Sequence, residues 1–277
     1  MDFQKSLRQT VEDYGLMAKK ALGQNFLLNQ DITDKIIRLS LEKQGRRNFE
    51  KTNVLEIGPG PGGLTRAILK QTPKTLTVIE MDDRCIEIMQ ELKSQTNVEM
   101  SIKNADALET DINDLGLAPL QIVSNLPYNI SVPLLTGWLK KMDKIEAMTL
   151  MFQKEVAQRI TAPIKTKDYG RLSVLAQLVC NVQKLWTLSP DCFVPAPKIY
   201  STVLLFEPLK DIPSNEILEK VEKITSLAFS QRRKMIRQSL KNLPDMEKRC
   251  EAAEVDLTSR AEEITPEQYL KMAEGIY

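Results

Sequence analysis

The chain has 277 residues, 42% hydrophobic and 27% charged, a globular balance, and no apolar run approaches the roughly 18 residues that a membrane span needs. Its net charge is +1 and it contains no histidine, which excludes Ser-His-Asp and Cys-His nucleophile chemistry and any histidine metal ligand. The four cysteines show no C-x-x-C spacing, so disulfides and a zinc site are not expected, and we expect no metal.

The first residues indicate where the protein works. Residues 1–20 carry charges of both signs and lack the apolar core of a secretory signal. We therefore expect a cytoplasmic protein with no membrane segment.

Short aliphatic runs alternate with stretches of helical periodicity along the first two thirds of the chain. Helices are expected at 64–71 and 84–95, where apolar residues recur at i, i+3 and i+4. The strands are expected at 53–58, 75–80, 98–103, 121–125, 147–153, 179–185 and 201–206. This alternation predicts an α/β fold with a mostly parallel seven-stranded sheet, the last two strands closing its edge.

The pattern changes after Pro208. Ser214 is a candidate cap for a first helix, Thr265-Pro266 a candidate cap for a later one, and the intervening sequence is helical in character. We therefore expect two domains, residues 1–210 with the sheet and residues 211–277 as a small all-α domain. Seven basic and two acidic residues occupy 229–249, whereas 251–277 reverses these numbers, so a charged working face is expected.

A glycine-rich turn, Gly58-Pro-Gly-Pro-Gly-Gly63, joins the first main strand to a helix. Such a turn brings backbone N–H groups close to a ligand. Glu80 ends the next strand, where a carboxylate accepts hydrogen bonds from ribose hydroxyls, and Asp106 follows the third strand, where it can accept from an adenine amine. A purely structural turn and an NAD site are the alternatives. Proline between the first two glycines departs from the dinucleotide pattern, and Glu80 and Asp106 favour S-adenosylmethionine. The next motif decides against NAD.

The segment Asn125-Leu126-Pro127-Tyr128 ends the fourth strand and suits methylation of an exocyclic amine. The lone pair of such an amine is delocalised into the base, so acceptors that hold its hydrogens help to aim it at a methyl group. The Asn125 side chain and a main-chain carbonyl of the Leu126-Pro127 turn can serve as acceptors, and Tyr128 can stack on an extruded base. A strand-end turn with a packed tyrosine is the alternative interpretation. This chemistry needs no histidine.

Nearly the whole chain resembles the bacterial small-subunit ribosomal RNA adenine dimethyltransferases. These are Rossmann-like class I methyltransferases. The matching stretches are Gly23-Gln-Asn-Phe-Leu27, Leu55-Glu-Ile-Gly-Pro-Gly60, Val78-Ile-Glu80, Asn104-Ala-Asp-Ala107, Asn125-Leu-Pro-Tyr-Asn-Ile-Ser131, Phe152-Gln-Lys-Glu-Val156, Tyr169-Gly-Arg-Leu-Ser173, Phe193-Val-Pro-Ala-Pro-Lys198 and Gln231-Arg-Arg-Lys234. Two departures are Lys19-Lys20-Ala21-Leu22, where the family often has arginines, and Ile199 in place of a family valine.

The resemblance implies a reaction and a set of residues. The reaction would convert two adjacent adenines in the terminal hairpin loop of small-subunit RNA, within the immature 30S subunit, to N6,N6-dimethyladenine in late subunit biogenesis. The cofactor contacts would be Asn25, Leu27, Gly58, Gly60, Glu80, Asp106 and Asn125. Phe193 could hold the second face of the target base, although a core phenylalanine fits the sequence equally well.

Basic residues at two places are candidate RNA contacts. They are Lys19, Lys20, Arg232, Arg233, Lys234, Arg237 and Lys241. For the last five, a solvated charged helix is the alternative. No heptad or apolar stripe indicates a dimer, so a monomer is expected.

The sequence leaves two other functions open. One is methylation of large-subunit adenine, the reaction of the related macrolide-resistance enzymes, which share the Gln-Asn-Phe element and the two-domain plan. The other is a ribosome-assembly factor whose main role is RNA binding.

Overall fold

The computed structural model describes residues 3–16 and 25–275. The described strands are β1 (Phe26–Leu27), β2 (Asn53–Ile57), β3 (Thr75–Glu80), β4 (Glu99–Asn104), β5 (Leu120–Ser124), β6 (Ile145–Gln153), β7 (Cys180–Leu188), β8 (Phe193–Val194) and β9 (Ser201–Pro208). The described α-helices are α1 (Leu7–Asp13), α2 (Gln30–Lys43), α3 (Gly63–Leu69), α4 (Asp83–Ser94), α5 (Tyr128–Leu139), α6 (Lys154–Ile160), α7 (Arg171–Val179), α8 (Asn215–Ser230), α9 (Ile236–Ser239), α10 (Met246–Ala252) and α11 (Pro266–Glu274).

The main sheet has seven strands in the order β4-β3-β2-β5-β6-β9-β7. The pairs from β4 to β6 are parallel, and β9 pairs with β6 in the antiparallel sense. This arrangement confirms the predicted mostly parallel, seven-stranded α/β fold. Because β2, β3, β4 and β5 are parallel, their carboxyl ends meet at one edge of the sheet, where ligands bind in open α/β folds.

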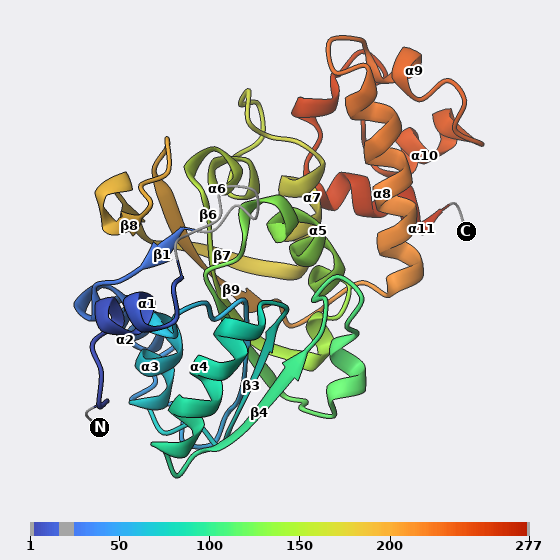
Figure 1. Cartoon of the computed structure of the whole chain (residues 1–277). Helices are drawn as coiled ribbons and strands as arrows, with labels where there is room; N and C mark the ends of the chain where they lie inside the picture. The colour runs from blue at the N-terminus through green and yellow to red at the C-terminus, as the bar shows by residue number, and fades with distance from the viewer. Residues whose placement is uncertain (1–2, 17–24, 276–277) are drawn as a thin grey trace. The chain divides into compact units, whose positions relative to one another are not determined.

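One face of the sheet is covered by α2, α3 and α4 (Figure 1). Their buried side chains, Ile37, Ile68 and Met89 among them, form a hydrophobic core with the strand residues Val54 and Val78. Sequence periodicity predicted α3 and α4 to within two residues, whereas α2 was not predicted.

The described chain divides into two compact, interleaved units. The first consists of residues 3–16, 25–135, 144–154 and 183–206, and contains the glycine-rich turn at 58–63 and the parallel strands. The second consists of 136–143, 155–182 and 207–275, and is largely helical. In the second unit the fully buried rings of Tyr169 and Tyr269 both contact Phe229, and the hydroxyl of Tyr169 donates to the carbonyl oxygen of Ile264 at 2.8 Å.

The caps predicted after Pro208 are confirmed. The Ser214 hydroxyl accepts from the N–H of Ile217 at the start of α8. Thr265 and Gln268 form a reciprocal capping box at the start of α11, with Pro266 at the first helical position. None of the helices in residues 3–16 and 25–275 is both long and apolar enough to cross a lipid bilayer.

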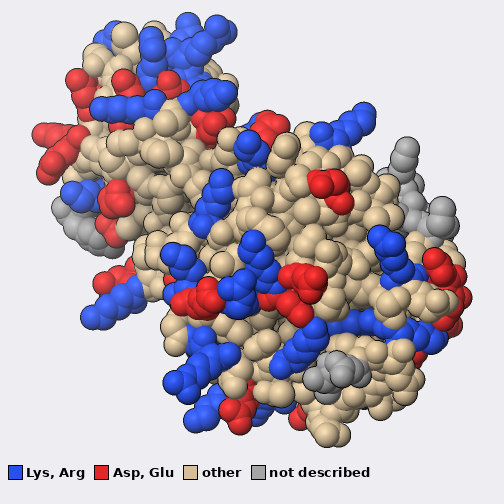
Figure 2. Space-filling model, turned by 90° about the vertical axis from the view of Figure 1, so that its left-hand side faces the viewer, with Lys and Arg blue, Asp and Glu red and all other residues tan. Residues whose placement is uncertain are grey.

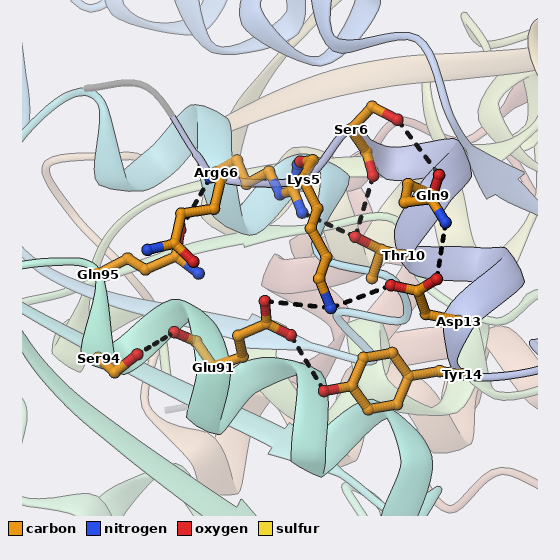
Figure 3. A network of polar contacts seen from close by, with 11 residues as sticks. Lys5, Ser6, Gln9, Thr10, Asp13, Tyr14, Arg66, Glu91, Ser94 and Gln95 are labelled. Carbon is orange, nitrogen blue, oxygen red and sulfur yellow. Dashed lines mark hydrogen bonds and ion pairs between the residues drawn. The ribbon is translucent and has the colours of Figure 1, made fainter.

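The N-terminal segment, residues 3–16, is attached to α3 and α4 by polar contacts (Figure 3). Arg66 of α3, which is 5% exposed, donates to the carbonyl oxygen of Lys5 at 2.6 Å and to the hydroxyl of Thr10 at 3.1 Å. Glu91 of α4 accepts from the hydroxyl of Tyr14 at 3.0 Å and lies 3.6 Å from the Lys5 ammonium. A buried guanidinium is stabilised by such carbonyl partners, so the segment is an integral part of the first unit.

Candidate active site

A cavity of about 710 Å³ lies at the carboxyl edge of the parallel strands. Its size is that of a cofactor site. Nine of the residues predicted to bind cofactor or base line it: Asn25, Gly58, Gly60, Glu80, Asp106, Asn125, Leu126, Pro127 and Tyr128. The structure therefore brings most of the predicted site together, although these residues come from five separate stretches of the chain.

The glycine loop between β2 and α3 is closely packed against its neighbours. Gly60 has φ +54°, and a Cβ there would come within 2.9 Å of the Phe26 ring. At Gly58, with φ +62°, a Cβ would contact the ring of Pro127. Positive φ and a close neighbour both favour glycine at these positions. The loop thus places backbone at the cavity wall and lies directly against the Leu126-Pro127 turn.

The two carboxylate oxygens of Glu80 have different partners: one accepts two backbone hydrogen bonds, and the other faces the glycine loop. Its Oε1 accepts from the N–H groups of Met81 and Asp82 at 2.8 and 3.0 Å. Its Oε2 receives a long contact of 3.4 Å from the N–H of Gly60. Two backbone donors hold the group in place, which leaves Oε2 suited to accept from the hydroxyls of a bound ribose.

Asp106 borders the same cavity beyond the end of β4. Its Oδ1 accepts from the N–H of Leu108 at 2.8 Å, which fixes the turn in which it lies. Ala105, just before it, donates its N–H to the carbonyl oxygen of Glu80 at 3.2 Å. The two carboxylates are therefore held by adjacent strand ends, an arrangement that fits a nucleoside with polar groups at both its sugar and its base.

Asn125 follows β5 and is oriented by a neighbouring backbone group. Its Nδ2 donates to the carbonyl oxygen of Asn25 at 3.2 Å, so the side-chain oxygen Oδ1 is left to accept from a ligand. Ser124 donates from its buried hydroxyl to the carbonyl oxygen of Ile57 at 2.6 Å and ties the end of β5 to the end of β2. The amide is thereby set beside the glycine loop.

Tyr128 begins α5 and is half-buried at the cavity wall. Its hydroxyl shares a 2.6 Å hydrogen bond with the hydroxyl of Ser201, the first residue of β9. Burial raises the pKa of Tyr128, whereas the hydrogen bond to Ser201 lowers it. The ring is therefore held at its distal end as an uncharged aromatic surface, as stacking on a base requires.

Glu56 is a buried carboxyl group beneath the loop that the sequence did not identify as functional. Its side chain is 1% exposed and accepts at Oε2 from the hydroxyl of Thr65 at 2.7 Å. The pKa of Glu56 is raised to about 8, mainly by burial and to a smaller extent by nearby Glu80, against the lowering effect of the hydrogen bond from Thr65. The sequence signal for this burial was the position of Glu56 in β2, two residues after Val54 and therefore on the same face of the strand.

Leu27 and Glu56 line a separate, small cavity of about 30 Å³. Leu27 was predicted to contact the cofactor, but the structure places it on this side of the loop and not among the residues of the larger cavity. Its backbone is close to α3, since a Cβ on Gly63 would come within 2.6 Å of the Leu27 carbonyl oxygen.

Several residues of the larger cavity were not predicted. They are Phe26, Ile57, Ile79, Met81, Asp82, Asp83, Arg84, Ala105, Ala107, Asn129 and Ile130. Met81 is 62% exposed directly after Glu80, and the sequence signal for it was an apolar residue just beyond a predicted strand end. Arg84 pairs with Asp82 at 2.6 Å and donates to the carbonyl oxygen of Gly15, so the cavity rim also holds the N-terminal segment.

Phe193 is placed as a core residue. Its side chain is 2% exposed, and it packs in the hydrophobic core of the first unit, with its backbone paired to Leu27. It is not among the residues that line the larger cavity. This structure therefore favours the core interpretation over base stacking, because a ring packed on its neighbours offers no face to a ligand.

The predicted RNA contacts fall into three groups. Lys19 and Lys20 lie outside the described residues. Arg233, Lys234, Arg237 and Lys241 are exposed, in a turn after α8, in α9 and just beyond it. Figure 2 shows basic and acidic side chains intermixed on the surface of the C-terminal helical part, at the top left of the view.

Arg232 differs from the other basic residues of this stretch. It forms an ion pair with Glu262 at 2.6 Å and donates to the carbonyl oxygens of Thr166 and Lys167 at 2.7 and 2.5 Å. Its donors are used within the second unit, so its geometry is that of a structural residue. The chain turns between Ser230 and Ile236, so Arg232, Arg233 and Lys234 lie in a turn between two helices.

The cysteines of this chain are thiols that stand apart from the cavity. Cys85, Cys180 and Cys250 are free and buried, and Cys192 is free and partly buried, as expected for reduced thiols. Burial raises the pKa of Cys85 and of Cys180, which makes both thiols unreactive. Across residues 3–16 and 25–275, no group of three or more acidic or thiol side chains is placed to hold a metal ion.

Known proteins resemble this chain over nearly its whole length. The family model for ribosomal RNA adenine dimethylase matches residues 15–277. The chain is 42% identical over 270 residues to ribosomal RNA small subunit methyltransferase A of Rhodospirillum rubrum, covering 98% of this chain and 92% of the relative. It is 44% identical to the protein of the same name from Cereibacter sphaeroides, covering 96% of this chain and 95% of that one.

Two solved structures share the fold. The 23S rRNA methyltransferase ErmE superposes with a TM-score of 0.67 at 25% identity, covering 90% of this chain and 98% of that one. A dimethyladenosine transferase from Plasmodium falciparum superposes with a TM-score of 0.72 at 24% identity, covering 88% and 94% of the two chains. The sequence identity to the small-subunit methyltransferases is thus well above that to the 23S enzyme.

Proposed function

The chain belongs to the ribosomal RNA adenine dimethylase family, and on that premise we propose that it methylates small-subunit ribosomal RNA. Methyl groups pass from S-adenosylmethionine to the N6 amines of two adjacent adenines in the 3′-terminal hairpin loop. Each amine exchanges two hydrogens for two methyl groups, so the pair consumes four cofactor molecules and releases four protons. The substrate is the RNA within the immature 30S subunit, and the protein acts as a monomer in the cytoplasm.

The cavity suits S-adenosylmethionine. Glu80 Oε2 would accept from the ribose hydroxyls, Asp106 from the adenine amine of the cofactor, and the backbone at Gly58 and Gly60 would lie along its length. The bound cofactor supplies an electrophilic methyl group. The acidic lining of this cavity also suits a cofactor that carries positive charge.

The acceptor amine is held by groups at the end of β5. Asn125 Oδ1 would accept one amine hydrogen and a main-chain carbonyl of the Leu126-Pro127 turn the other, which directs the nitrogen lone pair away from the ring. Tyr128 would stack on the base, and its position is maintained by Ser201. Alignment of this kind needs no general base, which is consistent with a chain without histidine.

The orientation of Asn125 is the single observation that carries this mechanism. The bond from its Nδ2 to the Asn25 carbonyl leaves an acceptor, and not a donor, for an incoming amine. We also propose that residues 1–210 form the methyltransferase part and that residues 211–277 contact the RNA through Arg233, Lys234, Arg237 and Lys241.

Tritiated methyl transfer to undermethylated small subunits, followed by nucleoside analysis, tests the proposal. We expect label in N6,N6-dimethyladenosine, and mature, fully methylated subunits serve as the control that accepts none. Label in large-subunit RNA, or no dimethyladenosine, would contradict it. The higher identity to small-subunit methyltransferases than to ErmE supports the small-subunit substrate.

A role in assembly apart from methylation can be separated in cells. An Asn125→Ala variant should bind pre-ribosomes but transfer methyl groups about 100-fold more slowly than the wild type. If this variant restored subunit assembly fully in a deletion strain, RNA binding would be the main role of the protein.

A further inference from the structure

An exposed aromatic residue lies beside the acceptor end of the active site. Tyr200 is 50% exposed, in the loop between β8 and β9, and its neighbours Lys198 and Ile199 are exposed as well. The ammonium of Lys154, at the start of α6, lies 5.5 Å from the centroid of the Tyr200 ring. We call Tyr200, Lys154 and Lys198 the Tyr200 surface.

The Tyr200 surface is joined to the cavity through a short series of bonds. The N–H of Lys154 donates to the carbonyl oxygen of Tyr200 at 2.9 Å, which continues the pairing of β6 with β9. The next residue, Ser201, is fully buried and shares the 2.6 Å hydrogen bond with Tyr128. Tyr200 therefore directly precedes, along the chain, the residue that positions the aromatic wall of the site.

The chemistry of this surface matches single-stranded RNA. An exposed aromatic ring offers a face on which any base can stack, and neighbouring lysines attract phosphate. Among the residues that the structure describes, Lys154 has no carboxylate partner, and the adjacent Glu155 is paired with Arg159. A core role for the ring is excluded by its exposure, and the lysines make a hydrophobic protein partner a poor match.

The proposed reaction creates a base that needs such a surface. When one adenine is extruded into the cavity, the nucleotide next to it loses a stacking neighbour. We propose that Tyr200 stacks on the nucleotide adjacent to the adenine being methylated, while Lys154 and Lys198 bind its phosphate. The inference rests on the proposed function and adds a determinant of how the RNA is positioned in the site.

Steady-state methylation of undermethylated small subunits by Tyr200→Leu, Tyr200→Phe and Lys154→Ala variants tests the inference. Leucine retains apolar volume without an aromatic face, whereas phenylalanine retains the face. We expect Tyr200→Leu to lower kcat/KM for the RNA about 10-fold, the size of effect that loss of one base–aromatic stack produces. Tyr200→Phe should match the wild type, and the affinity of every variant for S-adenosylmethionine, measured by calorimetry, should be unchanged.

The lysine is tested through the salt dependence of the same reaction. Lys154→Ala should reduce the slope of log kcat/KM against log salt by about 0.7, the contribution of one phosphate contact on a single strand. Lys93→Ala, which removes an exposed lysine of α4, is the matched control and should leave the slope unchanged.

Each outcome decides between stacking and its alternatives. Full activity of Tyr200→Leu, or equal losses in the leucine and phenylalanine variants, would overturn the stacking role. A parallel loss of cofactor affinity would show that Tyr200 merely supports the site. If the wild-type protein transfers no methyl groups to small subunits, the proposed function itself fails, and the inference fails with it, before any variant is compared.

Discussion

Replacement of Glu56 by glutamine should remove a pH dependence from the stability of the protein. The carboxyl group is 1% exposed, and its pKa is raised from 4.5 to about 8 by burial. Between these two values the folded chain keeps a proton that the unfolded chain has lost, so the free energy of unfolding falls as pH rises through this window. Below pH 4.5 the Glu56 carboxyl is protonated in the folded and in the unfolded chain, so it no longer lowers the free energy of unfolding.

The magnitude follows from the width of the window. Each pH unit between 4.5 and about 8 lowers the free energy of unfolding by about 1.4 kcal/mol, so the loss reaches about 5 kcal/mol at pH 8. In Glu56→Gln the side chain stays neutral, and its amide oxygen can still accept from Thr65. The difference between variant and wild type should therefore grow with pH in favour of the variant.

Urea denaturation at pH 5, 6, 7 and 8 measures this difference. The test is clean because the chain has no histidine to titrate in the same range. Glu87→Gln, at an exposed position of α4, is the matched control and should show no trend. A constant difference between Glu56→Gln and wild type over this pH range would refute the reasoning.

Three further substitutions test other parts of the structure. Asn125→Ala should lower the rate of methyl transfer in single-turnover assays about 100-fold, because one preorganised group at the reacting amine is lost; an unchanged rate would exclude Asn125 from the mechanism. Arg232→Ala should lower the free energy of unfolding by about 2 kcal/mol, because Arg232 loses its carboxylate and carbonyl partners. Arg233→Ala should leave the free energy of unfolding unchanged and weaken RNA binding in filter assays. The reverse pattern would assign Arg232 to RNA. Gly63→Ala should cost roughly 1–3 kcal/mol in thermal unfolding, because its Cβ would overlap the Leu27 carbonyl oxygen; wild-type stability would show that β1 can move.

The strands of the sheet were predictable from the sequence because their local chemistry agrees with the fold. Runs such as Val54–Ile57 are buried on both sides and end at glycine or polar residues, so burial and turn signals coincide. Because glycine or polar residues follow these buried runs, the sequence also predicted that the strand ends would form one site. Parallel pairing alone then brings Glu80 and Asn125 to one edge.

Side-chain roles that depend on tertiary packing were less predictable. The basic stretch from Arg232 to Lys241 gives no sign that Arg232 would be engaged by Glu262 and two carbonyl groups. Phe193 is similar, since a phenylalanine in a proline-rich loop can pack inward or face a ligand. Periodicity also did not predict α2, whose buried face is interrupted by the polar residues Thr33 and Ser40.

The interleaving of the two compact units has a consequence for protein engineering. Residues 155–182 lie between strands of the first unit in sequence but belong to the second, where the hydroxyl of Tyr169 bonds Ile264 and its ring meets Phe229. A fragment that stops at residue 210 would keep Tyr169 and lose both partners, and so would expose a buried aromatic surface. Exchange of the C-terminal helices between relatives should therefore succeed when residues 136–143 and 155–182 are exchanged together with them, because these three segments form one unit.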